Sequence, residues 1–91
     1  MKENSIKSIE YSNKFLKQAT KLTAETIKKA KEKELIFRGN HFDPRLKTHK
    51  LSGKNKDCRA FWIDYHNRIK FVFLKQKEVL FLEIGPHKIY K

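Results

Sequence analysis

The second half of the chain contains histidines and arginines, the side-chain types best suited to proton transfer and phosphate binding, among them His49, Arg68 and His87. A histidine with an ordinary pKa of about 6.5 can accept or donate a proton near neutral pH. An arginine can bind a phosphate group through two parallel hydrogen bonds. His87 follows a Gly-Pro turn at the expected end of a strand, and His49 lies in a basic stretch. These residue types are able to transfer protons and to bind phosphates.

A purely structural interpretation stays open for each of them. A histidine in a basic loop, such as His41 or His49, is usually a surface residue, and Arg68 could be a surface residue of a strand. His66 falls in an expected hairpin turn, although it could reach a nucleic acid. Cys58 is the single cysteine, so we interpret it as a small packing residue.

The charge of the chain is strongly positive. Its 91 residues include 22 Lys and Arg against 10 Asp and Glu, a formal net charge of +12. Such an excess favours polyanionic partners, and nucleic acid comes first among them. A merely solvated lysine-rich surface is the alternative, and a membrane surface is less favoured. The stretch from Arg38 to Arg59 concentrates the charge, with Arg45, Lys47, Lys50, Lys54 and Lys56 between its ends.

Length and composition indicate one small domain covering residues 1–91. A single cysteine excludes an intramolecular disulfide framework and a four-cysteine zinc site. No apolar run approaches the roughly 20 residues that cross a bilayer, and no signal-peptide pattern opens the chain. We therefore expect a cytoplasmic protein.

Hydrophobic spacing predicts the elements that must hold these side chains. A short strand is expected over Ile6–Tyr11, followed by two helices capped by Ser12 and Thr23 and joined near residues 22–23. The second helix is expected to run toward Leu35, and residues 38–56 are expected to form a long loop. Three strands then follow, over residues 58–65, 68–75 and 78–84. Their short connections favour an antiparallel meander in an α+β fold.

Alternation along these strands assigns their faces. The side expected to pack on the helices carries Phe61, Ile63, Ile69, Phe71, Phe73, Leu80, Leu82 and Ile84. The reverse side is expected to carry Ala60, Trp62, Arg68, Lys70 and Phe81. Cations beside aromatic rings, below a basic loop, favour nucleic-acid binding, because aromatic rings stack on bases while cations bind phosphates. The alternative is that Trp62 and Phe81 form a second, smaller hydrophobic cluster.

Several segments, in order and at matching spacing, resemble the RelE/StbE toxins, in particular the YafQ-like members of the RelE/ParE toxin–antitoxin superfamily. They are Phe42-Asp-Pro-Arg-Leu-Lys47, His49-Lys-Leu-Ser-Gly-Lys-Asn-Lys-Asp57, Phe61-Trp-Ile-Asp-Tyr65, Arg68-Ile-Lys-Phe71 and Glu83-Ile-Gly-Pro-His87 with Tyr90. The resemblance covers essentially the whole chain. It implies an N-terminal strand and a two-helix hairpin packed on a twisted antiparallel sheet.

The same resemblance implies a function: the toxin of a type II toxin–antitoxin system, a ribosome-dependent mRNA interferase. Such enzymes need no metal or other cofactor, and the ribose 2′-hydroxyl attacks the neighbouring phosphorus to leave a 2′,3′-cyclic phosphate. It implies His49 and His87 as the acid–base pair, in either order, Arg68 as a bidentate clamp on the scissile phosphate, and Tyr90 against the substrate nucleotide. Ala60 and Trp62 stand where relatives carry lysines or a histidine, so catalysis would depend on the histidines.

Nine further residues are expected to contact RNA: Arg45, Lys47, Lys50, Lys54, Lys56, Arg59, Trp62, His66 and Lys70. The resemblance also implies a cognate antitoxin. We expect its toxin-binding segment to be acidic or amphipathic, partly disordered alone, and to fold across the helices and the basic groove. Two alternatives stay open, a ParE-like inhibitor of DNA gyrase and a non-catalytic basic RNA-binding module.

Overall fold

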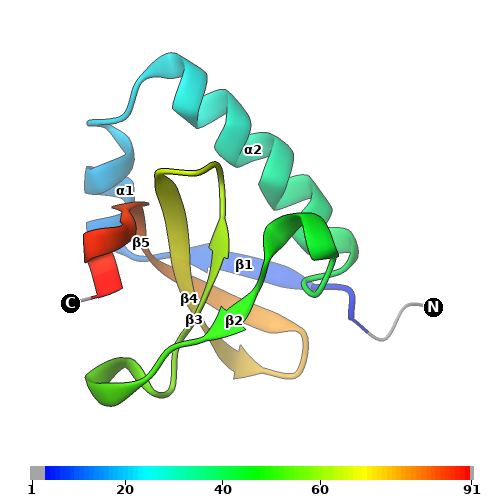
Figure 1. Cartoon of the computed structure of the whole chain (residues 1–91). Helices are drawn as coiled ribbons and strands as arrows, with labels where there is room; N and C mark the ends of the chain where they lie inside the picture. Colours follow the sequence, from blue (N-terminus) through cyan, green and yellow to red (C-terminus); the bar gives the residue numbers. More distant parts are fainter. Residues whose placement is uncertain (1–3, 91) are drawn as a thin grey trace.

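A five-stranded sheet with two helices on one side forms the protein (Figure 1). The computed structural model describes residues 4–90, without the side chains of His87 and Tyr90. The helices and strands are β1 (Ser8–Tyr11), α1 (Asn13–Ala19), α2 (Ala24–Gly39), β2 (His49–Lys50), β3 (Arg59–Trp62), β4 (Asn67–Lys75) and β5 (Glu78–Pro86). Three short 3-10 helices complete the fold, η1 (Pro44–Leu46), η2 (Gly53–Asn55) and η3 (His87–Tyr90). The α+β class is therefore confirmed.

Both helices begin at the residues that the sequence predicts. The Ser12 hydroxyl accepts a hydrogen bond from the Phe15 amide at 2.9 Å, and the Thr23 hydroxyl accepts one from the Thr26 amide at 3.1 Å. Such a cap stabilises a helix by about 1 kcal/mol. α2 continues to Gly39, beyond the predicted end, because Phe37 is completely buried in the core and holds the last turn against the sheet.

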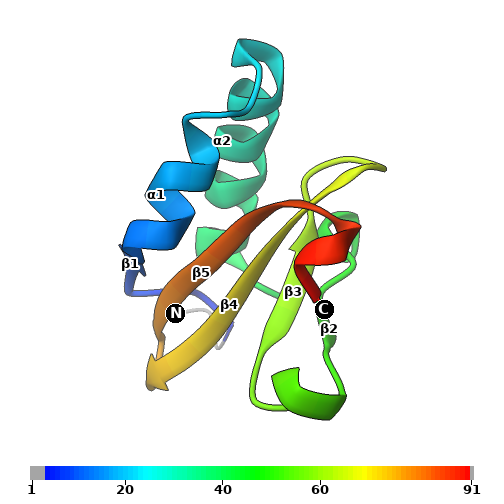
Figure 2. The same cartoon turned by 90° about the vertical axis from the view of Figure 1, so that its left-hand side faces the viewer.

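The sheet has the order β1-β5-β4-β3-β2. The predicted antiparallel meander is confirmed for β3, β4 and β5, and β2 adds an antiparallel edge. β1 is parallel to β5, pairing Ile9 with Val79. A parallel pair needs a long connection, and here both helices and the other three strands lie between β1 and β5 in the chain. The sheet is thus mixed. Figure 2 shows the helices on one side of it and η3 on the other.

Phenylalanine rings fill the space between the helices and the sheet. Phe37 stacks on Phe61 at a centroid distance of 4.8 Å and meets Phe71 edge-on at 4.9 Å. Phe81 belongs to the same cluster and is fully buried, so its predicted place on the reverse face is wrong. Such rings contribute both area and specific contacts.

A β-bulge explains that error. Lys70 pairs with Glu83, whereas the next residue, Phe71, pairs with Phe81, so Leu82 has no partner. The extra residue changes the alternation along β5. Phe81 therefore faces the core, while Leu80 and Leu82, predicted to face the helices, are only half-buried.

The predicted loop over residues 38–56 contains more structure than the sequence indicates. Asp43 caps η1, and Leu46 in η1 is fully buried, which anchors the segment. Lys47 then adopts a left-handed backbone conformation with φ 53°. The chain turns there and enters β2, where His49 pairs with Ala60 of β3. The loop thus brings His49 to the edge of the sheet.

Candidate nucleic-acid interface

Two rows of paired residues run across the sheet on the side opposite the helices. One row joins His49, Ala60, Lys70 and Glu83, and the next joins Trp62, Arg68 and Gly85. Directly paired residues of antiparallel strands lie on the same face. Neighbouring strands are about 4.8 Å apart, so the backbone of His49 lies about 10 Å from that of Lys70, two strands away in the same row. The predicted reverse face is therefore present, with the exception of Phe81.

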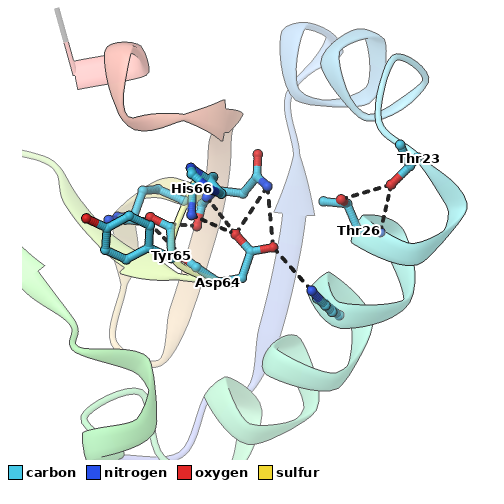
Figure 3. Close-up of polar contacts among 8 residues, drawn as sticks. Thr23, Thr26, Asp64, Tyr65 and His66 are labelled. Atoms are coloured by element: carbon cyan, nitrogen blue, oxygen red, sulfur yellow. Dashed lines mark hydrogen bonds and ion pairs between the residues drawn. The ribbon is translucent and has the colours of Figure 1, made fainter.

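The turn between β3 and β4 is held by the side chain of Asp64 (Figure 3). Its Oδ1 accepts hydrogen bonds from the amides of His66 at 2.9 Å and Asn67 at 2.8 Å, and its Oδ2 lies 3.7 Å from Nζ of Lys29 in α2. Burial raises the pKa of the Asp64 carboxyl, but the backbone N–H donors of Asn67 and His66 outweigh it, so the pKa lies below its ordinary value. The charged carboxylate thus fixes the turn and ties it to α2.

Arg68 holds the same turn from the other side. Its Nη1 donates to the backbone oxygens of Asp64 at 2.8 Å, Tyr65 at 2.9 Å and Asn67 at 3.2 Å. Its guanidinium carbon lies 3.8 Å from the centroid of the Trp62 ring, and the residue is 6% exposed. The Nε atom is buried without a hydrogen-bond partner. This arrangement does not offer two adjacent nitrogens to a phosphate, so it does not fit the predicted bidentate clamp.

A hollow lies between this turn and the end of β5. We call it the aromatic hollow. It is lined by Trp62, Tyr65, His66, Arg68, Pro86 and Lys88. Tyr65 is 76% exposed and meets Trp62 edge-on at 6.2 Å. Figure 3 shows Tyr65 and His66 next to each other on the turn. Outside the hollow, Nζ of Lys47 lies 5.0 Å from the Trp62 centroid, so the indole has cations near it from both β4 and the loop.

Sequence reasoning missed Tyr65 and Lys88 in this hollow. For Tyr65 the sequence did contain a signal. Tyr65 is an aromatic residue in a polar turn between Asp64 and Asn67, and an aromatic ring in such a turn is exposed, where it can bind a ligand. The predicted members Trp62 and His66 do lie in the hollow, and His66 is exposed. Exposed rings and cations around an open hollow are features of sites that bind single-stranded nucleic acid.

The histidines are in different environments. His49 is exposed, and its Nδ1 lies 2.9 Å from the backbone oxygen of Lys47. That contact orients the ring at the sheet edge. His41 is buried beside Phe73, with Nδ1 unpartnered, and burial followed by the charge of Arg59 lowers its pKa. His41 is therefore a core residue on the helix side.

Two predicted RNA-binding cations are less accessible than those of the basic loop. Lys70 is on the expected face but is 7% exposed, and its ammonium is hydrogen-bonded to Glu83, Asn55 and Ile89. Arg59 pairs with Phe71, and its guanidinium lies 5.5 Å from the Phe73 ring on the helix side of the sheet. A direct RNA contact by either residue stays a prediction, with Lys70 buried and Arg59 half-buried.

The other predicted phosphate-binding residues are at the surface. The basic loop exposes Arg45, Lys47, Lys50, Lys54 and Lys56. Arg45 forms an ion pair with Asp43 at 2.9 Å, and its hydrogen bonds lower the pKa of the Asp43 carboxyl to about 2. Asp43 therefore compensates part of the Arg45 charge. The lysines of the basic loop are exposed to solvent, where their charges can attract an anion.

The predicted roles of His87 and Tyr90 concern side chains outside the described part of the structure. Their backbone forms η3, which follows β5 directly and contacts both β4 and β5. Gly85 and Pro86 pair with Arg68 and Asn67, so η3 begins beside the aromatic hollow. The backbone of residue 87 therefore lies next to the aromatic hollow.

The sequence by itself matches no family model and no curated protein. Solved structures do match. The E. coli DinJ–YafQ toxin–antitoxin complex contains a chain with 22% identity and a TM-score of 0.71, over 89% of this chain and 92% of that one. HP0894 from Helicobacter pylori has 19% identity and a TM-score of 0.68, over 89% and 94% of the two chains. The chain has a RelE/YafQ-like toxin fold. A YoeB/ParE toxin from Agrobacterium tumefaciens matches this fold with a TM-score of 0.74 at 10% identity, over 89% and 99%.

Within this RelE/YafQ-like fold, residues 4–90 contain no group of three or more His, Cys, Asp and Glu side chains placed to hold a metal ion, as far as those side chains are described. In the same part of the chain no helix combines the length and the hydrophobicity needed to cross a bilayer. The features that stand out are therefore the aromatic hollow, the basic loop beside it and the histidine at the sheet edge.

Proposed function

We propose that this protein is the toxin of a toxin–antitoxin system and that it cleaves messenger RNA on the ribosome. The observation that carries the proposal is a RelE/YafQ-like fold whose open sheet face holds an aromatic hollow next to a basic loop. The net charge of +12 gives a polyanionic substrate long-range attraction.

His49 and His87 are the proposed acid–base pair, with the order of their roles open. The reaction needs a base for the ribose 2′-hydroxyl, an acid for the leaving 5′ oxygen and positive charge for the phosphorane. His49 lies at the edge of the row that continues to Lys70, and η3, which includes position 87, packs on β4 and β5. Tyr90, in the same 3-10 helix, is the proposed contact to the substrate nucleotide.

RNA binding is proposed to use the aromatic hollow for bases and the exposed lysines for phosphates. Trp62 and Tyr65 supply rings, and Lys47 and Lys88 supply charge at the rim. Arg68 contributes its positive charge next to the Trp62 indole and holds the turn between β3 and β4. It is not proposed to bind the phosphate through two hydrogen bonds. Stacking contributes about 1–3 kcal/mol per base.

The cognate antitoxin is proposed to cover the groove between α1 and α2. This groove is lined mostly by apolar residues, among them Phe15, Leu16, Ile27 and Ala30, with Lys31 at its rim. Leu16 is 51% exposed. An amphipathic segment with acidic residues fits such a surface, because its apolar side would cover the groove while its carboxylates meet the lysines of α2. The DinJ–YafQ complex is a precedent for a protein partner of this fold.

The two alternative functions have different expectations. A ParE-like gyrase inhibitor is supported by the likeness to the YoeB/ParE toxin, and it would bind protein without cutting RNA. A non-catalytic RNA-binding module is supported by the commitment of Arg68 to the turn. Either would leave His49 without a chemical role.

The test combines purified protein, ribosomes and a message with an open reading frame, followed by mapping of the new 5′ ends. We expect cuts within the reading frame that leave 5′-hydroxyl ends. The His49→Ala variant should cut about 10²–10⁴ times more slowly, the range for loss of one acid–base group. Lys75→Ala, which changes an exposed lysine at the end of β4 with no assigned role in RNA binding, is the control and should retain most activity. Intact message with defects in DNA supercoiling would support the gyrase alternative.

A further inference from the structure

Lys70 is a buried cation whose ammonium is surrounded by oxygen atoms. It lies in the middle of β4 and is 7% exposed. A lysine ammonium has three N–H donors and no acceptor. Three oxygens surround it, Oε2 of Glu83 at 2.7 Å, Oδ1 of Asn55 at 3.3 Å and the backbone oxygen of Ile89 at 3.4 Å. The ammonium therefore has an acceptor for every donor.

Its acceptors come from three separate segments of the chain. Asn55 belongs to η2, Glu83 to β5 and Ile89 to η3. The second oxygen of Glu83 continues the network to α1, where it lies 3.1 Å from Nε2 of Gln18 and 3.3 Å from Nζ of Lys14. One side chain in the sheet thus joins the loop, the last strand and the C-terminal turn.

We propose that Lys70 is a positioning residue that holds η3 and η2 on the open face of the sheet. Ile89 lies between positions 87 and 90, so the bond to its oxygen fixes the backbone that carries both. Lys70 also shares a cross-strand row with His49, with Ala60 between them. Its anchor therefore sets the backbone of positions 87 and 90 relative to His49. This catalytic consequence rests on the proposed nuclease function, whereas the anchoring itself does not.

A hydrophobic residue could fill the space under η3 but could not make these bonds. Replacing a buried ion pair by apolar groups is often tolerated, whereas removing one partner leaves a charge uncompensated. Here Glu83 keeps Lys14 and Gln18 when Lys70 is replaced, so its carboxylate is not left alone. We therefore expect Lys70→Met to fold, with the loss concentrated at Asn55 and Ile89.

The first experiment measures amide hydrogen exchange by mass spectrometry on the full chain. In Lys70→Met, peptides covering residues 86–90 and 53–56 should exchange about 10–100 times faster, the range for losing a hydrogen bond to a charged group. Peptides from α2 and β1 should be unchanged. Lys75→Met removes an exposed lysine of the same strand and should match the wild type. Lys70→Arg should restore much of the protection.

Unchanged exchange at residues 86–90 in Lys70→Met would overturn the proposal. If Lys70→Met proves unfolded, the double variant Lys70→Met/Glu83→Gln removes both charges of the ion pair. Its hydrogen exchange is then compared with that of the single variant Glu83→Gln. Faster exchange throughout the sheet in that double variant would show a general stability role and would equally overturn it.

The second experiment measures cleavage of message on ribosomes. Because the ammonium of Lys70 already has three acceptors within the protein, Lys70→Met should lower kcat about tenfold or more while KM stays within about twofold, and Lys70→Arg should recover part of kcat. A raised KM with unchanged kcat would mean direct RNA binding and would overturn the positioning role. If the wild type cuts no RNA, the proposed function fails, and the exchange experiment alone still decides whether Lys70 anchors η3.

Discussion

Replacement of Arg68 by methionine is the perturbation that best separates the two interpretations of this residue. The sequence predicts a phosphate ligand, whereas the structure uses the guanidinium to hold the turn between β3 and β4. Methionine keeps much of the side-chain length and can still pack against Trp62. It removes the charge and all donors to the three carbonyl oxygens.

The expected loss of stability follows from these contacts. Nη1 has two hydrogens for three carbonyl oxygens, so we count two charge-assisted hydrogen bonds. At about 1.5–3 kcal/mol each they contribute about 3–6 kcal/mol together, and the contact with the Trp62 ring at 3.8 Å adds about 1 kcal/mol. Allowing for the rest of the turn, which Asp64 still holds, a net loss of about 3 kcal/mol is expected. For a domain of this size that lowers Tm by about 12–24 °C.

The assay is thermal unfolding followed by circular dichroism, with urea unfolding as a second measurement. Lys75→Met, at the exposed end of the same strand, is the control for losing one positive charge, and its Tm should stay within about 3 °C of the wild type. Suppose Arg68→Met melts at the wild-type temperature and yet binds RNA more weakly. Arg68 would then be a phosphate ligand, and our account of the turn would be refuted.

Three further predictions concern the hollow and the core. Tyr65→Ala should weaken binding of a single-stranded oligonucleotide by about 5–150-fold through loss of stacking, whereas Tyr65→Phe should bind as the wild type does. Fluorescence anisotropy measures both affinities, and equal affinity of Tyr65→Ala and wild type would rule out stacking. Lys88→Met should reduce the slope of log K against log salt by about 0.7, and an unchanged slope would place Lys88 away from the phosphates. The pKa of His41 is lowered in the folded state, so stability should fall as pH decreases below its ordinary value of 6.5. His41→Phe should reduce that fall in urea titrations between pH 7 and about 5; an equally steep fall would assign it to other groups.

The sequence was most informative where the deciding interactions are local. Ser12 and Thr23 each bind an amide three residues ahead, so a side chain and its neighbours are enough to predict both helix starts. The order of elements follows in the same way from short connections and alternation. The end of α2 was harder, because Phe37 extends the helix through its burial under the sheet.

The errors come from interactions between distant residues. The bulge at Leu82 is a property of how β4 and β5 align, and a single strand read alone does not contain it. Burial of Arg68 and Lys70 has a similar origin, since their acceptors include turn carbonyls and the backbone of η3. Alternation placed both residues on the correct face but gave no information on what covers them there.

The two buried cations of β4 differ in what they leave for a bound anion. Lys70 is paired with the Glu83 carboxylate at 2.7 Å, so their charges largely cancel. Arg68 bonds only to neutral carbonyl oxygens, and the described side chains include no carboxylate in ion-pair contact with it. An unbalanced charge in a partly buried site acts through a lower effective dielectric constant than one in water. Under the proposed function, Arg68 would attract a phosphate toward the aromatic hollow without a direct hydrogen bond, while Lys70 would shape the adjoining surface. The open face would then divide recognition from positioning between residues only two apart in the sequence.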